Sequence, residues 1–78
     1  MTEEERSTFL EEVYDFQVIG KNERIQLAKK NNEHYPEELA FIGYWVSKGC
    51  IKVISKALGF INFKLTVHGI EYVEGNLK

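Results

Sequence analysis

Residues 51–66 have the sequence IKVISKALGFINFKLT, and this stretch decides the fold class. Residues 51–56 are rich in β-branched side chains, and residues 61–65 alternate apolar and polar side chains without interruption. Both patterns favour strands. The short connector between them contains Gly59, as hairpin loops often do. The stretch therefore predicts two antiparallel strands joined as a hairpin.

Capping residues and apolar spacing predict helices on both sides of this hairpin. Thr2 followed three residues later by Glu5 is a capping box. Pro36 suits the first turn of a helix, where its missing N–H costs nothing, and Thr66 can cap a last helix. The expected helices cover about 3–17, 22–31, 36–48 and 67–75, and the expected strands cover about 51–56 and 61–65.

The expected order is therefore helix, helix, helix, strand, strand, helix, which is an α+β fold. With 78 residues, the chain corresponds to one small domain spanning residues 1–78. An apolar fraction of 44% is enough for a compact core and is unlike the composition of disordered chains.

The net charge of −2 hides an uneven distribution of charge along the chain. Residues 1–15 contain six acidic side chains and one arginine. By contrast, residues 39–70 contain four lysines and no acid. The sequence therefore predicts a molecule with separate acidic and basic regions.

The cysteine and hydropathy patterns indicate a cytoplasmic protein without a membrane partner. Cys50 is the one cysteine, so no disulfide can form within the chain, as is typical of a reducing compartment. The longest apolar run, residues 39–46, is too short to span a bilayer.

We find no constellation of residues that would support catalysis or hold a metal. The candidate groups are His34, His68, Cys50 and scattered carboxylates, and they form no metal-binding or nucleophilic motif. Cys50 follows the glycine that ends the third helix and is better explained as a small buried side chain. We expect no enzyme activity, no cofactor and no metal.

Three phrases carry a resemblance to a known family. They are YPEEL at 35–39, SKGCI at 47–51 and LTVHGIEYV at 65–73. With the expected order of elements, they resemble those of small bacterial and phage winged helix-turn-helix proteins. The resemblance implies a winged-helix domain that regulates transcription by binding double-stranded DNA, as a dimer, through the third helix and the wing.

Six residues are candidates for contacts with DNA. In a winged-helix fold, Lys48, Lys56 and Lys64 would contact phosphates, and Tyr44 would contact a base edge or sugar. Lys29 and Lys30 would flank this surface. A second reading is that these lysines only solvate a sheet and protect its edge. The acidic residues at 37 and 38 oppose strong DNA binding, because the start of the recognition helix usually enters the major groove.

The alternative is a protein-interaction module that binds a partner or a second copy. A helical wheel places Leu39, Ile42 and Val46 on one side of the third helix. It places Glu37, Phe41, Tyr44 and Lys48 on the other side, where exposed aromatic residues would form a docking patch. A rotated wheel would instead put Phe41 in the core. A weaker third reading is that the acidic first helix imitates DNA.

Overall fold

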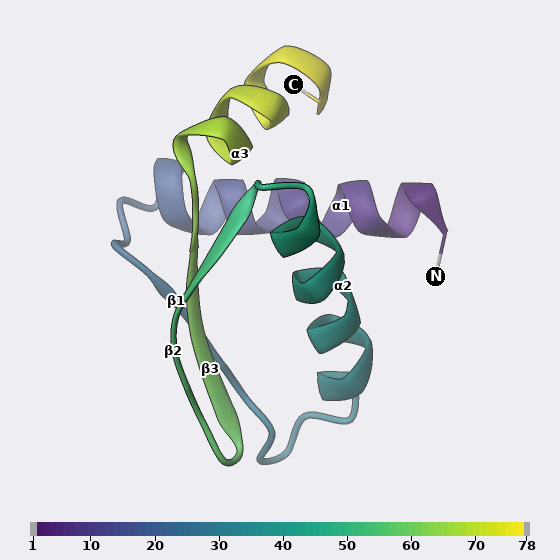
Figure 1. Cartoon of the computed structure of the whole chain (residues 1–78), viewed down its shortest axis with the longest axis vertical. Helices are drawn as coiled ribbons and strands as arrows, with labels where there is room; N and C mark the ends of the chain where they lie inside the picture. Colours follow the sequence, from purple (N-terminus) through teal and green to yellow (C-terminus); the bar gives the residue numbers. More distant parts are fainter. Residues whose placement is uncertain (1, 78) are drawn as a thin grey trace.

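The computed structural model describes residues 2–77 as an α+β domain with a three-stranded antiparallel sheet (Figure 1). The α+β class expected from the sequence is therefore confirmed. The elements are, in chain order, α1 (Glu3–Tyr14), η1 (Asp15–Ile19), β1 (Ile25–Ala28), α2 (Tyr35–Ser47), β2 (Ile51–Ala57), β3 (Phe60–Leu65), α3 (Val67–Tyr72) and η2 (Val73–Leu77), where η marks a π-helical segment.

Helix α1 begins at the predicted capping box. The Thr2 hydroxyl accepts from the Glu5 backbone N–H at 3.1 Å, and the Glu5 carboxylate accepts from the Thr2 backbone N–H at 2.9 Å. These two bonds satisfy donors that a helix start otherwise leaves unpaired. The segment η1 extends the helical region to Ile19, close to the predicted end at residue 17. Leu10 and Val13 bury the inner face of the helix.

The predicted helix over 22–31 is wrong, because this segment forms β1. Its side chains alternate in burial, with Ile25 and Leu27 half-buried and Gln26 and Ala28 exposed. Two apolar residues at spacing two fit a strand, and β3 offers them a pairing edge. The observed order is therefore helix, strand, helix, strand, strand, helix, with fewer α-helices and more strands than expected.

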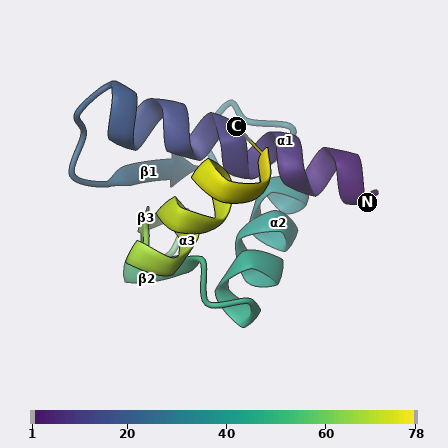
Figure 2. The same ribbon diagram turned by 90° about the horizontal axis from the view of Figure 1, so that it is seen from above.

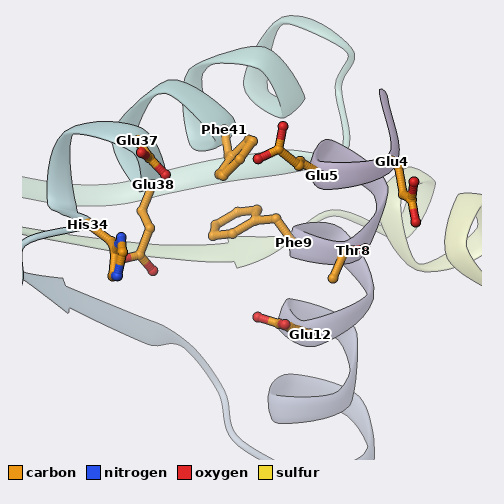
Figure 3. Close-up of a pocket in the computed structure, with 9 residues that line it drawn as sticks. All are labelled: Glu4, Glu5, Thr8, Phe9, Glu12, His34, Glu37, Glu38 and Phe41. Atoms are coloured by element: carbon orange, nitrogen blue, oxygen red, sulfur yellow. The ribbon is translucent and has the colours of Figure 1, made fainter. Parts of the chain in front are cut away.

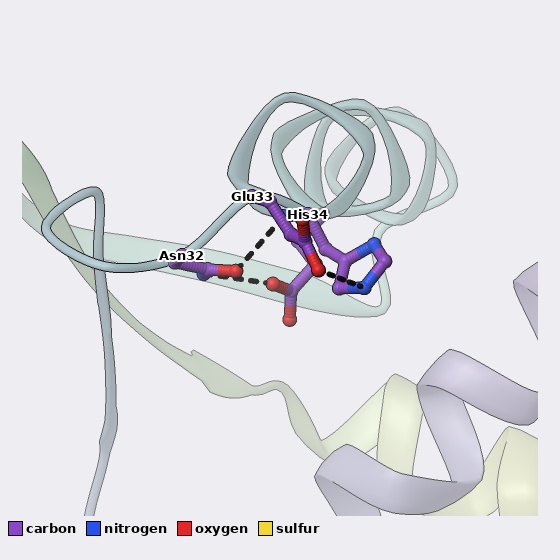
Figure 4. Close-up of polar contacts among 4 residues, drawn as sticks. Asn32, Glu33 and His34 are labelled. Carbon is purple, nitrogen blue, oxygen red and sulfur yellow. Dashed lines mark hydrogen bonds and ion pairs between the residues drawn. The ribbon is translucent and has the colours of Figure 1, made fainter.

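A turn over residues 29–34 joins β1 to α2 and is held by Asn32 (Figure 4). The Asn32 amide donates to the Ala28 carbonyl at 3.3 Å and to the Glu38 carboxylate at 2.9 Å. Its side-chain oxygen accepts from the backbone N–H of His34 at 3.0 Å. One side chain thus bonds to the end of the strand and to the first turns of the helix, which begins at Tyr35.

The predicted start and end signals of helix α2 are both present. Pro36 lies in its first turn, and Lys48 is its C-cap. Gly49 follows with φ of +78°, a conformation that side chains rarely tolerate, so the helix ends where the sequence predicts. Ile42 and Trp45 bury its inner face.

The hairpin is confirmed, with β2 and β3 joined by a turn at residues 58 and 59. The sheet order is β1-β3-β2, so β3 is central. A bulge between Val53 and Ser55 shifts the register of β2. The buried side of β3 consists of Ile61, Phe63 and Leu65 and belongs to one hydrophobic core with residues of α1 and α2. Figure 2 shows the sheet at one side of the molecule and α2 at the other.

Thr66 links the last helix to the end of α2. Its hydroxyl accepts from the Gly69 backbone N–H at 2.9 Å and donates to the Gly49 carbonyl at 2.6 Å. The predicted cap of α3 is therefore present. Gly69 lies against the backbone of Cys50, where a side chain would collide with the carbonyl oxygen.

Candidate nucleic-acid interface

One face of the sheet is covered by helices and the other is open. The buried residues of β3 alternate with Asn62 and Lys64, which therefore point away from the core. The pairing register assigns residues of β1 and β2 to the same side. We call this side the open face, and it consists of Gln26, Ala28, Lys52, Ser55, Ala57, Phe60, Asn62 and Lys64.

Lysine lies opposite lysine on the open face. Lys52 pairs with Lys64 in the register of β2 and β3, and both side chains are exposed. Within residues 2–77, neither lysine forms an ion pair. The next row contains uncharged hydrogen-bonding groups, because Asn62 lies between Gln26 and Ser55 and donates to the Ser55 hydroxyl at 3.0 Å.

The strands carry positive charge and no negative charge. β1, β2 and β3 together contain Lys52, Lys56 and Lys64 and no acid. Acidic side chains instead gather on α1 and in the first turn of α2. The uneven charge of the sequence thus corresponds to a basic sheet and an acidic helical region, and such a distribution favours an anionic partner at the sheet.

Two predicted residues, Tyr44 and Lys48, lie together at the end of α2. The Lys48 ammonium is 5.6 Å from the centre of the Tyr44 ring, and the Arg6 guanidinium is 4.3 Å from it. Tyr44 also meets Trp45 edge-on, with ring centres 5.0 Å apart. A cleft of about 240 Å³ adjoins them, lined by Tyr44, Trp45, Lys48, Cys50, His68 and Tyr72.

The other predicted lysines divide between the two ends of the hairpin. Lys29 is near the turn, because its backbone N–H donates to the Gly59 carbonyl at 2.8 Å, and Lys30 follows it. Lys56 lies opposite Ile61, also near the turn. Lys64 is three residues further along β3, which is roughly 10 Å of strand. The structure therefore does not bring all six predicted residues into one cluster.

The face of α2 that points to solvent differs from the predicted one. Phe41 is half-buried because it stacks on Phe9 of α1, with ring centres 5.2 Å apart. Val46, expected on the buried side, is 40% exposed. The residues exposed along the helix include Glu37, Ala40, Gly43 and Ser47. The predicted docking patch of Glu37, Phe41, Tyr44 and Lys48 thus has two half-buried aromatic rings, and its role stays a prediction.

Sequence reasoning omitted Lys52 from the candidate residues. Lys52 lies in the β-branched run at 51–56 that predicted a strand, but only the register with β3 places it beside Lys64. The bulge after Val53 makes this register difficult to predict, since it changes which side chains share a face beyond that point.

A second concave feature lies between α1 and the start of α2 (Figure 3). This groove has a volume of about 430 Å³ and is floored by the stacked rings of Phe9 and Phe41. Its lining also contains Thr8, His34 and five glutamates, which are Glu4, Glu5, Glu12, Glu37 and Glu38. We call it the α1/α2 groove. It is an apolar floor with an acidic rim.

Two buried groups have shifted pKa values with structural causes. Cys50 is 1% exposed, and this burial raises the pKa of its thiol. The hydrogen bond from the Tyr14 hydroxyl to the Glu74 carboxylate, at 2.7 Å, raises the pKa of Tyr14. Both groups are therefore held in their neutral form.

Within residues 2–77, no group of three or more His, Cys, Asp or Glu side chains is arranged to hold a metal ion. In the same part of the chain, no helix has the length and apolar character needed to cross a membrane. The chain matches no family model, no curated protein and no solved structure.

Proposed function

We propose that this chain is a small DNA-binding domain of the winged-helix type, which holds the phosphate backbone of a duplex against the open face of its sheet. The observation that carries the proposal is the pairing of Lys52 with Lys64 on a solvent-exposed sheet face without an acid on any strand. Like charges directly opposite one another destabilise a sheet. An anionic ligand removes this cost, because each phosphate neutralises a lysine.

The row beside the lysines supplies further contacts to a nucleic-acid backbone. Gln26, Ser55 and Asn62 offer amide and hydroxyl groups, which are common donors to phosphate and sugar oxygens. Lys56 pairs with Ile61, on the other side of the sheet, so the open face itself supplies these contacts. Such contacts fix the position of a duplex without reading its sequence.

Helix α2 is poorly suited to reading bases. Its first turn contains Glu37 and Glu38, and the acidic rim of the α1/α2 groove adjoins it. Carboxylates there repel phosphates where a recognition helix enters the major groove. Its exposed Ala40 and Gly43 offer no side-chain hydrogen bonds to base edges. We therefore expect binding with little sequence preference.

The winged-helix assignment belongs to this proposal. A hairpin that follows a helix and leads into a capped terminal helix supports it. A helix-turn-helix motif needs two consecutive helices, whereas α2 is preceded by the turn at 29–34 and by β1. In this assignment the hairpin is the wing, and the wing rather than α2 provides most of the contacts.

The test is a titration of a fluorescent random-sequence duplex at several salt concentrations. We expect affinity to fall steeply with salt. Substituting both Lys52→Gln and Lys64→Gln should reduce the slope of log affinity against log salt by about 1.8, because each lost phosphate contact removes about 0.9. Lys21→Gln, which removes one exposed lysine before β1 and outside the open face, is the control for each single substitution. Absence of binding at low salt, or a larger effect of the control, would overturn the proposal.

A further inference from the structure

We infer that two copies of this chain form a dimer in which the hairpin turn of each copy occupies the α1/α2 groove of the other. This inference goes beyond the proposed function, since it requires no nucleic acid. It rests on two surfaces that have opposite charge and matching apolar centres and that belong to the same chain.

The first surface is the hairpin turn. Leu58 is 103% exposed, so it contacts nothing in its own chain beyond its neighbours. Lys56 precedes it on β2, and the Gly59 carbonyl beside it is bonded to the backbone of Lys29 at 2.8 Å. Lys30 follows. The turn is therefore a single apolar side chain surrounded by cations.

The second surface is the α1/α2 groove, whose features are the reverse. Phe9 and Phe41 form its floor and are half-buried, so part of each ring faces the groove. In Figure 3, Glu5 and Glu12 project from α1 beside these rings, and Glu37 and Glu38 lie on the α2 side. The groove is therefore an apolar centre surrounded by carboxylates.

The chemistry of each surface makes the other surface a suitable binding partner. A leucine covering the two phenylalanine rings would remove apolar surface from water, which is the main source of affinity at an interface. Lysine side chains can bury their aliphatic stems along the same rings while their ammonium groups reach the carboxylates. Carboxylates crowded around the groove repel one another, and these ammonium groups relieve that repulsion.

Two-fold symmetry closes this arrangement into a dimer. A turn and a groove are different surfaces, so a single contact between copies would leave one of each unused and permit an open chain. When the exchange is reciprocal, both turns and both grooves are filled in one closed particle. Lys52 and Lys64 take no part in the exchange and stay available on the open face.

The test is the mass of the purified chain in solution, measured by light scattering and sedimentation without nucleic acid. We expect a concentration-dependent dimer that weakens as salt rises, because the contact is partly electrostatic. A monomer at every concentration in low salt, or species larger than a dimer, would overturn the inference.

Two substitutions of exposed apolar residues make the test specific. Leu58→Glu should raise the dissociation constant by at least about 100-fold, because each dimer loses two buried leucines and gains two buried acids. Val67→Glu is the matched control, since Val67 is 73% exposed at the start of α3 and lies outside both surfaces. Circular dichroism should show that both variants fold. Dissociation by the control, or no effect of Leu58→Glu, would contradict the arrangement.

A charge exchange tests the pairing itself. Glu37→Lys and Lys56→Glu should each prevent self-association, since each variant places like charges at both contacts. When the two variants are mixed, one contact is native and the other has its charges reversed, so a mixed dimer should form. A mixture that stays monomeric would exclude the proposed pairing of turn and groove.

Discussion

The pairing of Lys52 with Lys64 predicts that these residues lower the stability of the free protein while they increase its affinity for DNA. Two unit charges about 6 Å apart in water repel by about 0.7 kcal/mol. Measured effects of cross-strand pairs are about 0.2–1 kcal/mol. Lys64→Glu converts this repulsion into attraction, so we expect the free energy of unfolding to rise by about 1 kcal/mol.

The single tryptophan provides the measurement of this effect. Trp45 is 4% exposed, and its indole N–H donates to the Arg6 carbonyl at 3.0 Å, so its fluorescence should report unfolding in urea. A gain of about 1 kcal/mol raises the melting temperature by about 4–8 °C in a domain of this size. The gain should shrink at high salt, because both charges are exposed.

A double-mutant cycle separates this pair effect from other consequences of each substitution. Lys52→Glu alone should stabilise the protein as Lys64→Glu does. The double variant again has like charges in register, so its stability should return close to that of the original chain. Both single variants should bind DNA more weakly. A loss of stability in either single variant, or unchanged DNA binding with increased stability, would refute the reasoning.

Three further predictions follow from the packing and the shifted pKa values. Gly69→Ala should lower the free energy of unfolding by about 3 kcal/mol, because the added methyl group meets the Cys50 carbonyl. Gly43→Ala in the exposed middle of α2 should raise it by about 1 kcal/mol. Thermal unfolding of the two variants measures both effects. The Cys50 thiol is buried and has a raised pKa, so it should react with a thiol reagent only as fast as the protein opens. A reaction rate equal to that of the unfolded protein would contradict this burial. Because the folded pKa of Tyr14 lies above its unfolded value of about 10, the stability from its bond to Glu74 should be complete below that pH and be lost as pH rises through the folded pKa. Absorbance titration should therefore detect the late ionisation of Tyr14, and Tyr14→Phe should remove that transition.

The features that the sequence predicted well are those determined by nearby residues. The capping box at Thr2, the start of α2 near Pro36, its end at Gly49 and the cap at Thr66 each depend on contacts within a few positions. The hairpin is similar, since its strands are joined by a two-residue turn. Local physical rules are sufficient for such elements.

The features that the sequence did not predict depend on partners far along the chain. Ile25 and Leu27 fit a helix or a strand, and the pairing with β3, more than 30 residues away, decides between them. The orientation of α2 depends on Phe9, which draws Phe41 inward. The candidate site differs from the predicted one for the same reason, because only the register places Lys52 beside Lys64.

The bulge in β2 has a consequence for how this protein behaves when concentrated. β2 is an edge strand, with β3 on one side and an unpaired edge on the other. Such an edge is a template onto which a strand from another molecule can add, which is how fibrils begin. The register shift between Val53 and Ser55 interrupts that template after three residues, and Lys52 and Lys56 place a charge on each side of the interruption. An incoming strand therefore finds no continuous ladder of hydrogen bonds on β2, and we expect the irregular strand to disfavour strand addition at this edge.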